Sequence, residues 1–257
     1  MVAEVVKNVD NAPTIKEIVR GPYLVGGADI LSEDIATEVV RMMRVVPDAS
    51  PQGVLGGRGY TGIQNLPGLG RIFVKQYAHG GLLRHVTGGH FLCIGPSRSR
   101  QEYDILERVR SLGVKAPRPL LYVTKGSFLC QTWLIMEEIP NSRNLVEVTK
   151  SEASDSSEFQ EANGDLLHDV MRKLSDQVLT LIRNRILHVD LHPGNVLVGN
   201  NGDVFIVDFD KAVDFKGSVE TLRDLYLRRW RRAVIKHKLS PALTEYMSYT
   251  LRSHNEW

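Results

Sequence analysis

The sequence has few cysteines, almost no net charge and no long apolar run. Its two cysteines, Cys93 and Cys130, lack a CxxC or other metal-ligand spacing, so we expect neither a disulfide nor zinc, and a reducing cytoplasm as the compartment. The formal net charge of +2 over 257 residues is too small for a general nucleic-acid-binding protein. Any basic function must therefore depend on local clusters of arginine and lysine.

Membrane and secretion signals are also missing. No stretch approaches the roughly 18 consecutive apolar residues of a membrane span, and "MVAEVVKNVD" at the N-terminus lacks a basic region followed by an apolar core. We expect a protein that is made and kept inside the cell. With 42% hydrophobic residues, the chain can bury a substantial core, in one large domain or two small ones.

The first half of the chain alternates between helical and strand patterns. Apolar residues at helical spacing predict a helix over 32–46 and another over 97–113, the second ended by Gly113. β-branched and aromatic residues bounded by turn signals predict strands at 71–77, 119–125 and 127–139. We therefore expect a mostly antiparallel sheet with one main inserted helix.

The second half is expected to be mostly helical. An acidic, serine-rich stretch at 151–165 reads as a solvated loop or a weak helix, and a long core-facing helix follows at 166–186. Next comes a hairpin in which "NVLV" and "VFIV" flank the turn "GNNGD". A last helix is predicted over 219–239.

Polar residues stand at the ends of this hairpin. The run "HVDLHPGN" places Asp190 five residues before Asn195, and Asp208 ends the second strand. Oxygen ligands of this kind suit Mg²⁺, whose coordination substrate phosphates usually complete, and an acid left free of metal can accept a hydroxyl proton. Phosphoryl transfer from a nucleotide requires both functions. The alternative is a hairpin whose end acids only cap turns.

These motifs resemble the catalytic loop and the metal-binding DFG motif of the protein-kinase-like superfamily, with "DFD" in place of DFG. The resemblance implies that Asp190 is the catalytic base and that Asn195 and Asp208 hold Mg²⁺. It also implies that His188 serves the catalytic loop by packing and hydrogen bonding around the metal motif. His192 is open between loop scaffolding and contact with substrate or phosphate.

The resemblance extends to the first half. Lys75 lies where a kinase strand offers its lysine to the α- and β-phosphates of ATP, and Glu102 lies in the following helix, where it can pair with that lysine. Without the other motifs, Lys75 would be an ordinary surface lysine.

Two further nucleotide contacts are expected from the same resemblance. The glycine-rich "GGRGYTG" is expected to cover phosphates with backbone N–H groups of Gly57, Arg58 and Gly59, although a plain turn is the alternative. Glu137 and Ile139 are expected at the hinge, where backbone groups would meet the adenine edge.

The fold that this resemblance implies is α+β and bilobal. Residues 1–139 would form the N-lobe with an N-terminal extension, an antiparallel sheet with one main helix, and the clamp for the nucleotide phosphates. Residues 140–257 would form a mostly helical C-lobe with the catalytic loop, the metal site and a basic C-terminal helix. ATP and Mg²⁺ are the implied cofactors.

Other segments are similar to the lipopolysaccharide core kinase family, above all its 3-deoxy-D-manno-octulosonic acid (Kdo) kinases. The likeness is carried by "KQYAHGGLL", "LIMEEIPNSRNL" and "DFDKA", and it covers about Gly56 to Lys238. Kdo kinases often show Arg-His-Tyr where this chain has Lys75-Gln76-Tyr77, and heptose kinases of the family retain the lysine. The resemblance implies phosphorylation of a sugar hydroxyl on the lipopolysaccharide inner core, with Kdo expected and heptose as the alternative.

A substrate of this kind is an anionic glycolipid at the cytoplasmic face of the bacterial inner membrane, so a peripheral membrane contact is implied, and no nucleic acid. The final predicted helix is rich in cations around an apolar stripe of Leu222, Leu225, Tyr226 and Trp230. Basic groups near an anionic bilayer attract it by about 1 kcal/mol each. The alternative is a solvated helix whose stripe packs in the C-lobe. His79, Arg84 and His85 are weaker candidates for contact with the sugar acid.

Two other classes of function are weighed against this one. Another small-molecule kinase, for example one acting on an aminoglycoside, would need an acidic cleft for its cationic acceptor. A catalytically silent nucleotide-binding scaffold at the membrane is disfavoured by the intact set of Lys75, Asp190, Asn195 and Asp208.

Overall fold

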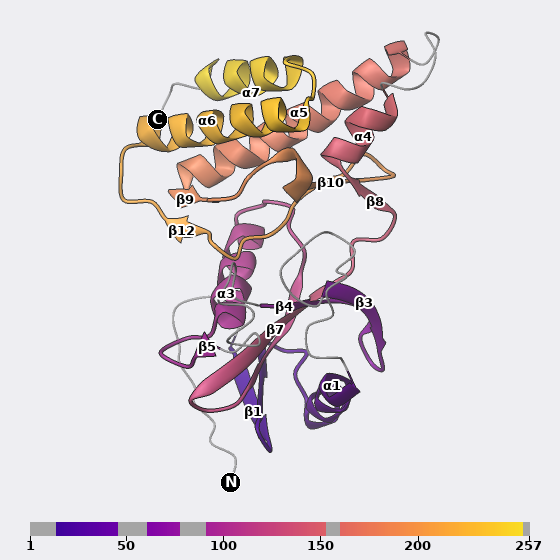
Figure 1. Cartoon of the computed structure of the whole chain (residues 1–257), viewed down its shortest axis with the longest axis vertical. Helices are drawn as coiled ribbons and strands as arrows, with labels where there is room; N and C mark the ends of the chain where they lie inside the picture. Colours follow the sequence, from indigo (N-terminus) through magenta and orange to yellow (C-terminus); the bar gives the residue numbers. More distant parts are fainter. Residues whose placement is uncertain (1–13, 46–60, 78–90, 153–159, 254–257) are drawn as a thin grey trace. The chain divides into compact units, whose positions relative to one another are not determined.

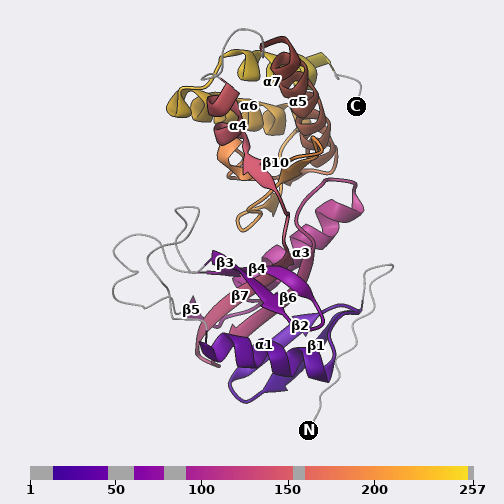
Figure 2. The same cartoon turned by 90° about the vertical axis from the view of Figure 1, so that its right-hand side faces the viewer.

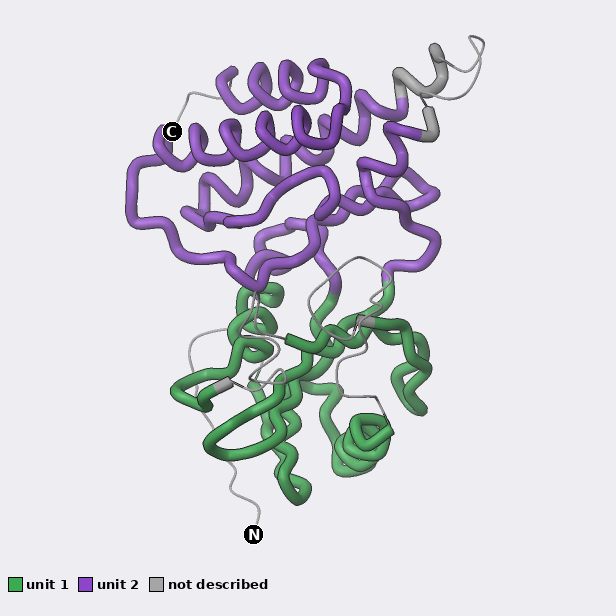
Figure 3. The backbone as a smooth tube through the Cα atoms, in the orientation of Figure 1, with its two compact units in different colours: residues 1–107, 118–138 green, residues 108–117, 139–257 purple. Residues whose placement is uncertain are grey.

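The computed structural model describes residues 14–45, 61–77, 91–152 and 160–253. Contacts within the chain divide it into two compact units (Figure 3). Unit 1 comprises residues 1–107 and 118–138, and unit 2 comprises residues 108–117 and 139–257. Helix α3 therefore begins in unit 1 and ends in unit 2.

Unit 1 is built on an antiparallel sheet, and the described residues place seven strands in it. The strands run in the order β1-β2-β6-β7-β4-β3, with β5 paired to β7. Their bounds are β1 (Lys16–Arg20), β2 (Tyr23–Gly27), β3 (Thr61–Leu66), β4 (Gly70–Gln76), β5 (Phe91–Leu92), β6 (Pro119–Lys125) and β7 (Leu129–Glu137), as labelled in Figure 1. The predicted strands correspond to β4, β6 and β7.

Helices α1 (Glu33–Val45) and α3 (Arg98–Ser111) pack on this sheet (Figure 2). The Ser32 hydroxyl accepts the amide of Ile35 at 3.2 Å and caps α1. The apolar face of α1 joins Val25, Ile72 and other strand residues in one buried core. Since neighbouring strand residues point to opposite faces, α3 meets the other face, where its Tyr103 ring lies 5.4 Å from that of Tyr122.

The two cysteines correct a prediction from the sequence. The structure joins Cys93 and Cys130 in a disulfide, with Cα atoms 5.8 Å apart. They are 37 residues apart in sequence, and the pairing of β5 with β7, in which Phe91 faces Cys130, brings them together. The expectation of no disulfide is therefore wrong, because a search for local spacing cannot see a pair made by strands. The reducing compartment loses that support.

Unit 2 combines helices with short strands. Its elements are β8 (Ser142–Asn144), α4 (Leu145–Glu152), α5 (Gln160–Arg183), β9 (Ile186–Leu187), the 3-10 helix η2 (Pro193–Asn195), β10 (Val196–Gly199), β11 (Val204–Ile206), β12 (Val213–Asp214), α6 (Val219–His237) and α7 (Ala242–Ser253). Strand β10 pairs with β11 and β8, and β12 pairs with β9. The predicted hairpin is β10-β11, and the α+β fold with an N-terminal antiparallel sheet is confirmed.

Helix α5 differs from its prediction at its start. It begins at Gln160 rather than at residue 166, so part of the predicted solvated stretch is helical. Among the described residues, no helix has both the length and the hydropathy needed to cross a membrane. Inside unit 2, Gln177 of α5 donates to the carbonyl of Val204 at 2.9 Å and accepts the amide of Lys115 at 2.8 Å. The segment 108–117 is thus tied to α5 and β11.

Candidate active site

The loop that carries Asp190 is held by hydrogen bonds to its own end. The side-chain amide of Asn195 donates to the carbonyl of Asp190 at 2.9 Å. The carbonyl of Asn195 accepts the amide of Val207 at 3.0 Å. These two bonds join the loop to the segment immediately before Asp208. Three residues that the sequence predicted as one site are therefore connected within unit 2.

His188 lies at the centre of this connection and is 1% exposed. Its Nδ1 accepts the amide of Asp190 at 3.2 Å, so the neutral ring carries its proton on Nε2, which donates to the carbonyl of Val207 at 3.0 Å. The ring also packs edge-on against Phe209, with 4.6 Å between centroids. Burial lowers the pKa of His188 to about 4. A neutral imidazole with both nitrogens hydrogen-bonded holds the two motifs together and does not act as a general acid.

Asp208 occupies a left-handed backbone position with φ of 65°, a conformation that aspartate tolerates better than most residues. Its two neighbours in sequence, Val207 and Phe209, are the residues held by His188. The negative charges of Asp190 and Asp208 both oppose the burial effect on the pKa of His188. Both carboxylates therefore lie near enough to the same imidazole to influence its pKa.

The donor set fits Mg²⁺. Because Nδ2 of Asn195 is used by the carbonyl of Asp190, its Oδ1 is the atom suited to a cation. Within the part of the chain that the structure describes, His, Cys, Asp and Glu form no group of three that could enclose a metal. Asn195 and Asp208 would be the protein ligands of Mg²⁺, and water and substrate phosphates would supply the rest, as this ion prefers.

His192 shows the scaffolding role that the sequence left open. Its Nδ1 accepts the amide of Gly194 at 3.0 Å and caps the 3-10 helix η2. A side chain at position 194 would bring its Cβ within 2.9 Å of Cε1 of His192, so this bond requires glycine. Burial lowers the pKa of His192, and its ring stacks with His237 at 6.2 Å between centroids.

Arg229 of α6 is a site residue that the sequence reasoning did not find. Its Nη2 donates to Oδ1 of Asp190. In the sequence it is one of several cations of the last predicted helix, for which a membrane contact and a solvated face were both open. Because the two residues are 39 positions apart, no local pattern could have revealed the contact.

Unit 1 contains the predicted ion pair. Nζ of Lys75 lies 2.9 and 2.7 Å from the two carboxylate oxygens of Glu102, whose side chain is 1% exposed. The Tyr77 hydroxyl donates to Oε2 of the same carboxylate, and Nζ of Lys75 lies 5.2 Å from the centre of the Tyr77 ring. Lys75 and Tyr77 share one strand face because they are two residues apart. That spacing was the available signal for Tyr77.

The remaining predicted nucleotide contacts are only partly described. Gly57, Arg58 and Gly59 lie outside the described residues, as do His79, Arg84 and His85. The amide of Glu137 donates to the carbonyl of Arg118 at 2.9 Å, so this amide is already engaged within unit 1. The carbonyl of Ile139 accepts the hydroxyl of Ser142 at 3.0 Å. Both residues stay predictions.

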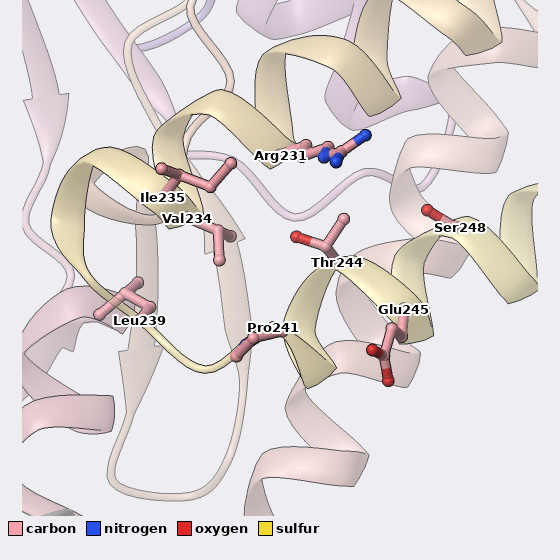
Figure 4. A pocket seen from close by; sticks show the side chains of 8 residues that line it. All are labelled: Arg231, Val234, Ile235, Leu239, Pro241, Thr244, Glu245 and Ser248. Carbon is pink, nitrogen blue, oxygen red and sulfur yellow. The ribbon is translucent and has the colours of Figure 1, made fainter.

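The basic helix α6 turns its apolar stripe inward. Leu222, Tyr226 and Trp230 are buried, as the alternative reading of this helix expected. Its exposed residues include Arg228, Arg231, Arg232 and Lys236, and Ile235 is 65% exposed. A pocket between α6 and α7 is lined by Arg231, Val234, Ile235, Leu239, Pro241, Thr244, Glu245 and Ser248 (Figure 4). It contains none of the predicted catalytic, nucleotide or metal residues.

Comparison with known families adds to this geometry. A family model described as the lipopolysaccharide kinase (Kdo/WaaP) family matches residues 56–250. The chain belongs to this family. The matched range contains every predicted catalytic and metal position of this lipopolysaccharide kinase family member, including Lys75, Glu102, Asp190, Asn195 and Asp208. The resemblance stated from the motifs is confirmed.

Curated relatives within this family carry the name 3-deoxy-D-manno-octulosonic acid kinase. The protein from Vibrio cholerae serotype O1 is 30% identical over 142 residues, which are 54% of this chain and 55% of the relative. That from Vibrio vulnificus is 27% identical over 163 residues, 62% and 64% of the two chains. That from Xanthomonas axonopodis pv. citri is 27% identical over 185 residues, 70% and 68%. The match thus spans between about half and two thirds of these relatives.

Proposed function

We propose that the protein transfers the γ-phosphate of ATP to a hydroxyl group of Kdo on the inner core of a lipopolysaccharide precursor. The support for the reaction is membership of the lipopolysaccharide kinase family. The support for the acceptor is the name shared by the curated relatives. The single structural observation that carries the proposal is the pair of hydrogen bonds that ties Asn195 to Asp190 and to Val207.

Each residue of the site has a separate role in the proposed reaction. Asp190 accepts the proton of the acceptor hydroxyl as its oxygen attacks phosphorus. Asn195 and Asp208 would hold Mg²⁺, which would neutralise charge on the phosphates. His188 keeps the loop and the Asp208 segment in register, through its bonds to Asp190 and Val207.

Lys75, a residue of unit 1, contacts the phosphates of the nucleotide. Glu102 directs Nζ of Lys75 by accepting from it with both oxygens, at 2.9 and 2.7 Å. The hydroxyl of Tyr77 in turn directs the carboxylate of Glu102. A charge held in one place by a buried partner costs little reorganisation when substrate binds.

The choice between Kdo and heptose turns on few residues. Kdo kinases often differ from this chain at Lys75 and Gln76. Gln76 is 4% exposed and, one residue along from Lys75, points to the opposite face of the sheet. The difference at Gln76 therefore concerns the buried sheet face that carries Ile72 and Val74 rather than the face of Lys75. We retain Kdo as the acceptor on the strength of the relatives, with heptose as an outcome of the test.

One assay tests the reaction and the acceptor together. The purified protein receives Mg²⁺ and labelled ATP with Kdo-bearing lipid A precursor, with heptosylated core, or with an aminoglycoside. We expect label in the Kdo-bearing acceptor. Label confined to the heptosylated core would move the acceptor to heptose, and label confined to the aminoglycoside would overturn the substrate class. Stabilisation by ATP without transfer to any acceptor would indicate a nucleotide-binding scaffold.

We also propose a peripheral contact with the cytoplasmic face of the inner membrane through α6. Its support is the exposed cations of the helix, with Arg231 beside the exposed apolar Ile235. Each cation near an anionic surface contributes about 1 kcal/mol. Exchanging Arg231 and Arg232 for glutamine should weaken binding to vesicles with anionic lipid by about tenfold or more, and leave binding to neutral vesicles unchanged. Equal binding of wild type and variant to the anionic vesicles contradicts this contact.

A further inference from the structure

Arg229 has surroundings unlike those of the other cations of α6. Its side chain is 36% exposed and is thus partly buried, whereas its neighbour Arg228 is exposed. The Nε atom of Arg229 is buried and has no hydrogen-bond partner among the described residues. An Nη2 atom of the same guanidinium donates to Oδ1 of Asp190. A membrane-facing cation would have none of these properties, so a different role is required.

Helix α6 fixes the position of this guanidinium. Trp230, the next residue, is buried in the core of unit 2. One turn earlier, the hydroxyl of Tyr226 accepts the amide of His188 at 2.8 Å. The helix is therefore attached to the catalytic loop two residues before Asp190, and its rigid backbone delivers Arg229 to the carboxylate.

Stability alone does not account for this pair. The side chains of Arg229 and Asp190 are 36% and 33% exposed, and ion pairs at such exposure contribute little to folding. The pair also opposes the charge of a carboxylate that has to accept a proton. A guanidinium bound to one carboxylate oxygen does, however, stop the carboxylate from rotating and leaves the other oxygen available to a hydroxyl group.

We propose that Arg229 is a positioning residue of the phosphotransfer site, which holds Oδ1 of Asp190 so that Oδ2 faces the acceptor hydroxyl. The inference rests on the proposed function. In the step concerned, the hydroxyl proton moves to Oδ2, and the acceptor oxygen bonds to the γ-phosphorus. The bond from that phosphorus to the bridging oxygen breaks, and ADP leaves. Arg229 makes and breaks no covalent bond, and acts through the orientation of Asp190.

The test measures kcat and KM separately with the full chain, Mg²⁺, ATP and the Kdo-bearing acceptor. We expect Arg229→Ala to lower kcat about 10- to 100-fold, the scale of a misplaced catalytic group, with both KM values within about twofold. Arg229→Lys should recover part of kcat, since an ammonium can still hold one oxygen. Arg172→Ala is the matched control, because Arg172 forms an ion pair with Asp169 at 2.6 Å on the solvated face of α5; its kcat should equal that of wild type.

A double variant separates positioning from other effects. Adding Arg229→Ala to Asp190→Ala should cost no further activity if Arg229 acts only through the acid. A full additional loss overturns the inference, and so does a raised acceptor KM at unchanged kcat, which would mean that Arg229 binds the acceptor. If the wild-type protein is active and Arg229→Ala has the same kcat and KM, the role of Arg229 is overturned and the proposed function is not. A wild-type protein that transfers phosphate to no acceptor overturns the proposed function with it. If Arg229→Ala does not fold, Arg229→Lys and Arg229→Gln carry the same comparison.

Discussion

In unit 1 the carboxylate of Glu102 is almost fully buried, at 1% exposure, whereas in unit 2 the carboxylate of Asp190 is 33% exposed. Glu102 pairs with Lys75, and Asp190 pairs with Arg229. A buried carboxylate that loses its cation leaves an unpaired charge in a low dielectric, so its pair is a structural necessity. A partly exposed one keeps its hydration and can exchange partners. The comparison favours a structural role for the first pair and, under the proposed function, a role in orienting the catalytic base for the second.

The largest effect that can test this comparison is on activity in unit 2. Asp190→Ala should lower kcat by about 10² to 10⁴-fold, the usual contribution of a general base. Because the side chain is partly exposed, the melting temperature should stay close to that of wild type. Transfer of labelled phosphate and thermal melting in parallel check both parts. Activity within a few-fold of wild type removes Asp190 from the role of base.

The next effect is on stability in unit 1. Lys75→Met removes the Lys75 cation from the buried carboxylate of Glu102, and we expect a loss of about 3 kcal/mol in the free energy of unfolding. Denaturant titration measures it. The control is Arg20→Met, also in unit 1, because both side chains of the Arg20–Glu33 pair are exposed, at 41% and 55%. Equal losses for the two variants would break the comparison between buried and exposed pairs.

These pairs also show what the sequence could and could not reveal. Helix α1, strands β4, β6 and β7 and the hairpin β10-β11 follow from local periodicity and turn signals, so they were predictable. Asn195 directly precedes the first strand of this hairpin, and Asp208 follows the second within two residues, as the sequence predicted; their catalytic roles stay predictions. Contacts between distant segments were not predictable in this way. Examples are Arg229 with Asp190 and Cys93 with Cys130.

Short elements escaped prediction for a related reason. Strands β9 and β12 have two residues each, too few to show any alternation, and exist because each supplies the other with hydrogen bonds. The hairpin β1-β2 turns at Gly21, whose φ is 59°, but its outer strand is mostly exposed and carries little apolar pattern. Tertiary pairing, not local preference, decides such segments.

A third, smaller effect concerns pH in unit 2. Burial lowers the pKa of His188 to about 4 from 6.5, so between these pH values the unfolded chain binds a proton that the folded protein does not. The stability linked to this group is complete above pH 6.5 and is lost as the pH falls toward 4. His188→Gln should reduce the loss of unfolding free energy between pH 7.5 and 4.5 by on the order of 2 kcal/mol.

The control for this measurement is His168→Gln on α5. His168 is exposed, and its replacement should leave the pH dependence as it is in wild type. Denaturant titrations at the two pH values give the comparison. A His188→Gln protein that loses as much stability on acidification as wild type would show that His188 does not carry the effect.

The smallest effect concerns the hydrogen bond from the Tyr77 hydroxyl to Glu102. Tyr77→Phe removes the hydroxyl that donates to this buried carboxylate, and bonds to charged groups contribute about 1.5 to 3 kcal/mol. We expect a loss near the lower figure, since Lys75 still contacts both oxygens. Tyr249→Phe is the control because Tyr249 is 75% exposed. A Tyr77→Phe protein as stable as wild type would mean that this hydrogen bond does not contribute to the free energy of unfolding.

The assignment of residues 108–117 to unit 2 bears on how the chain folds during synthesis. The strands of unit 1 are all present once Glu138 has left the ribosome. Lys115, made earlier, finds its partners Gln177 and Ile206 only much later. A nascent chain therefore holds Lys115 without these two partners while unit 1 assembles. A split gene cut after residue 138 would place Lys115 and both of its partners on different polypeptides.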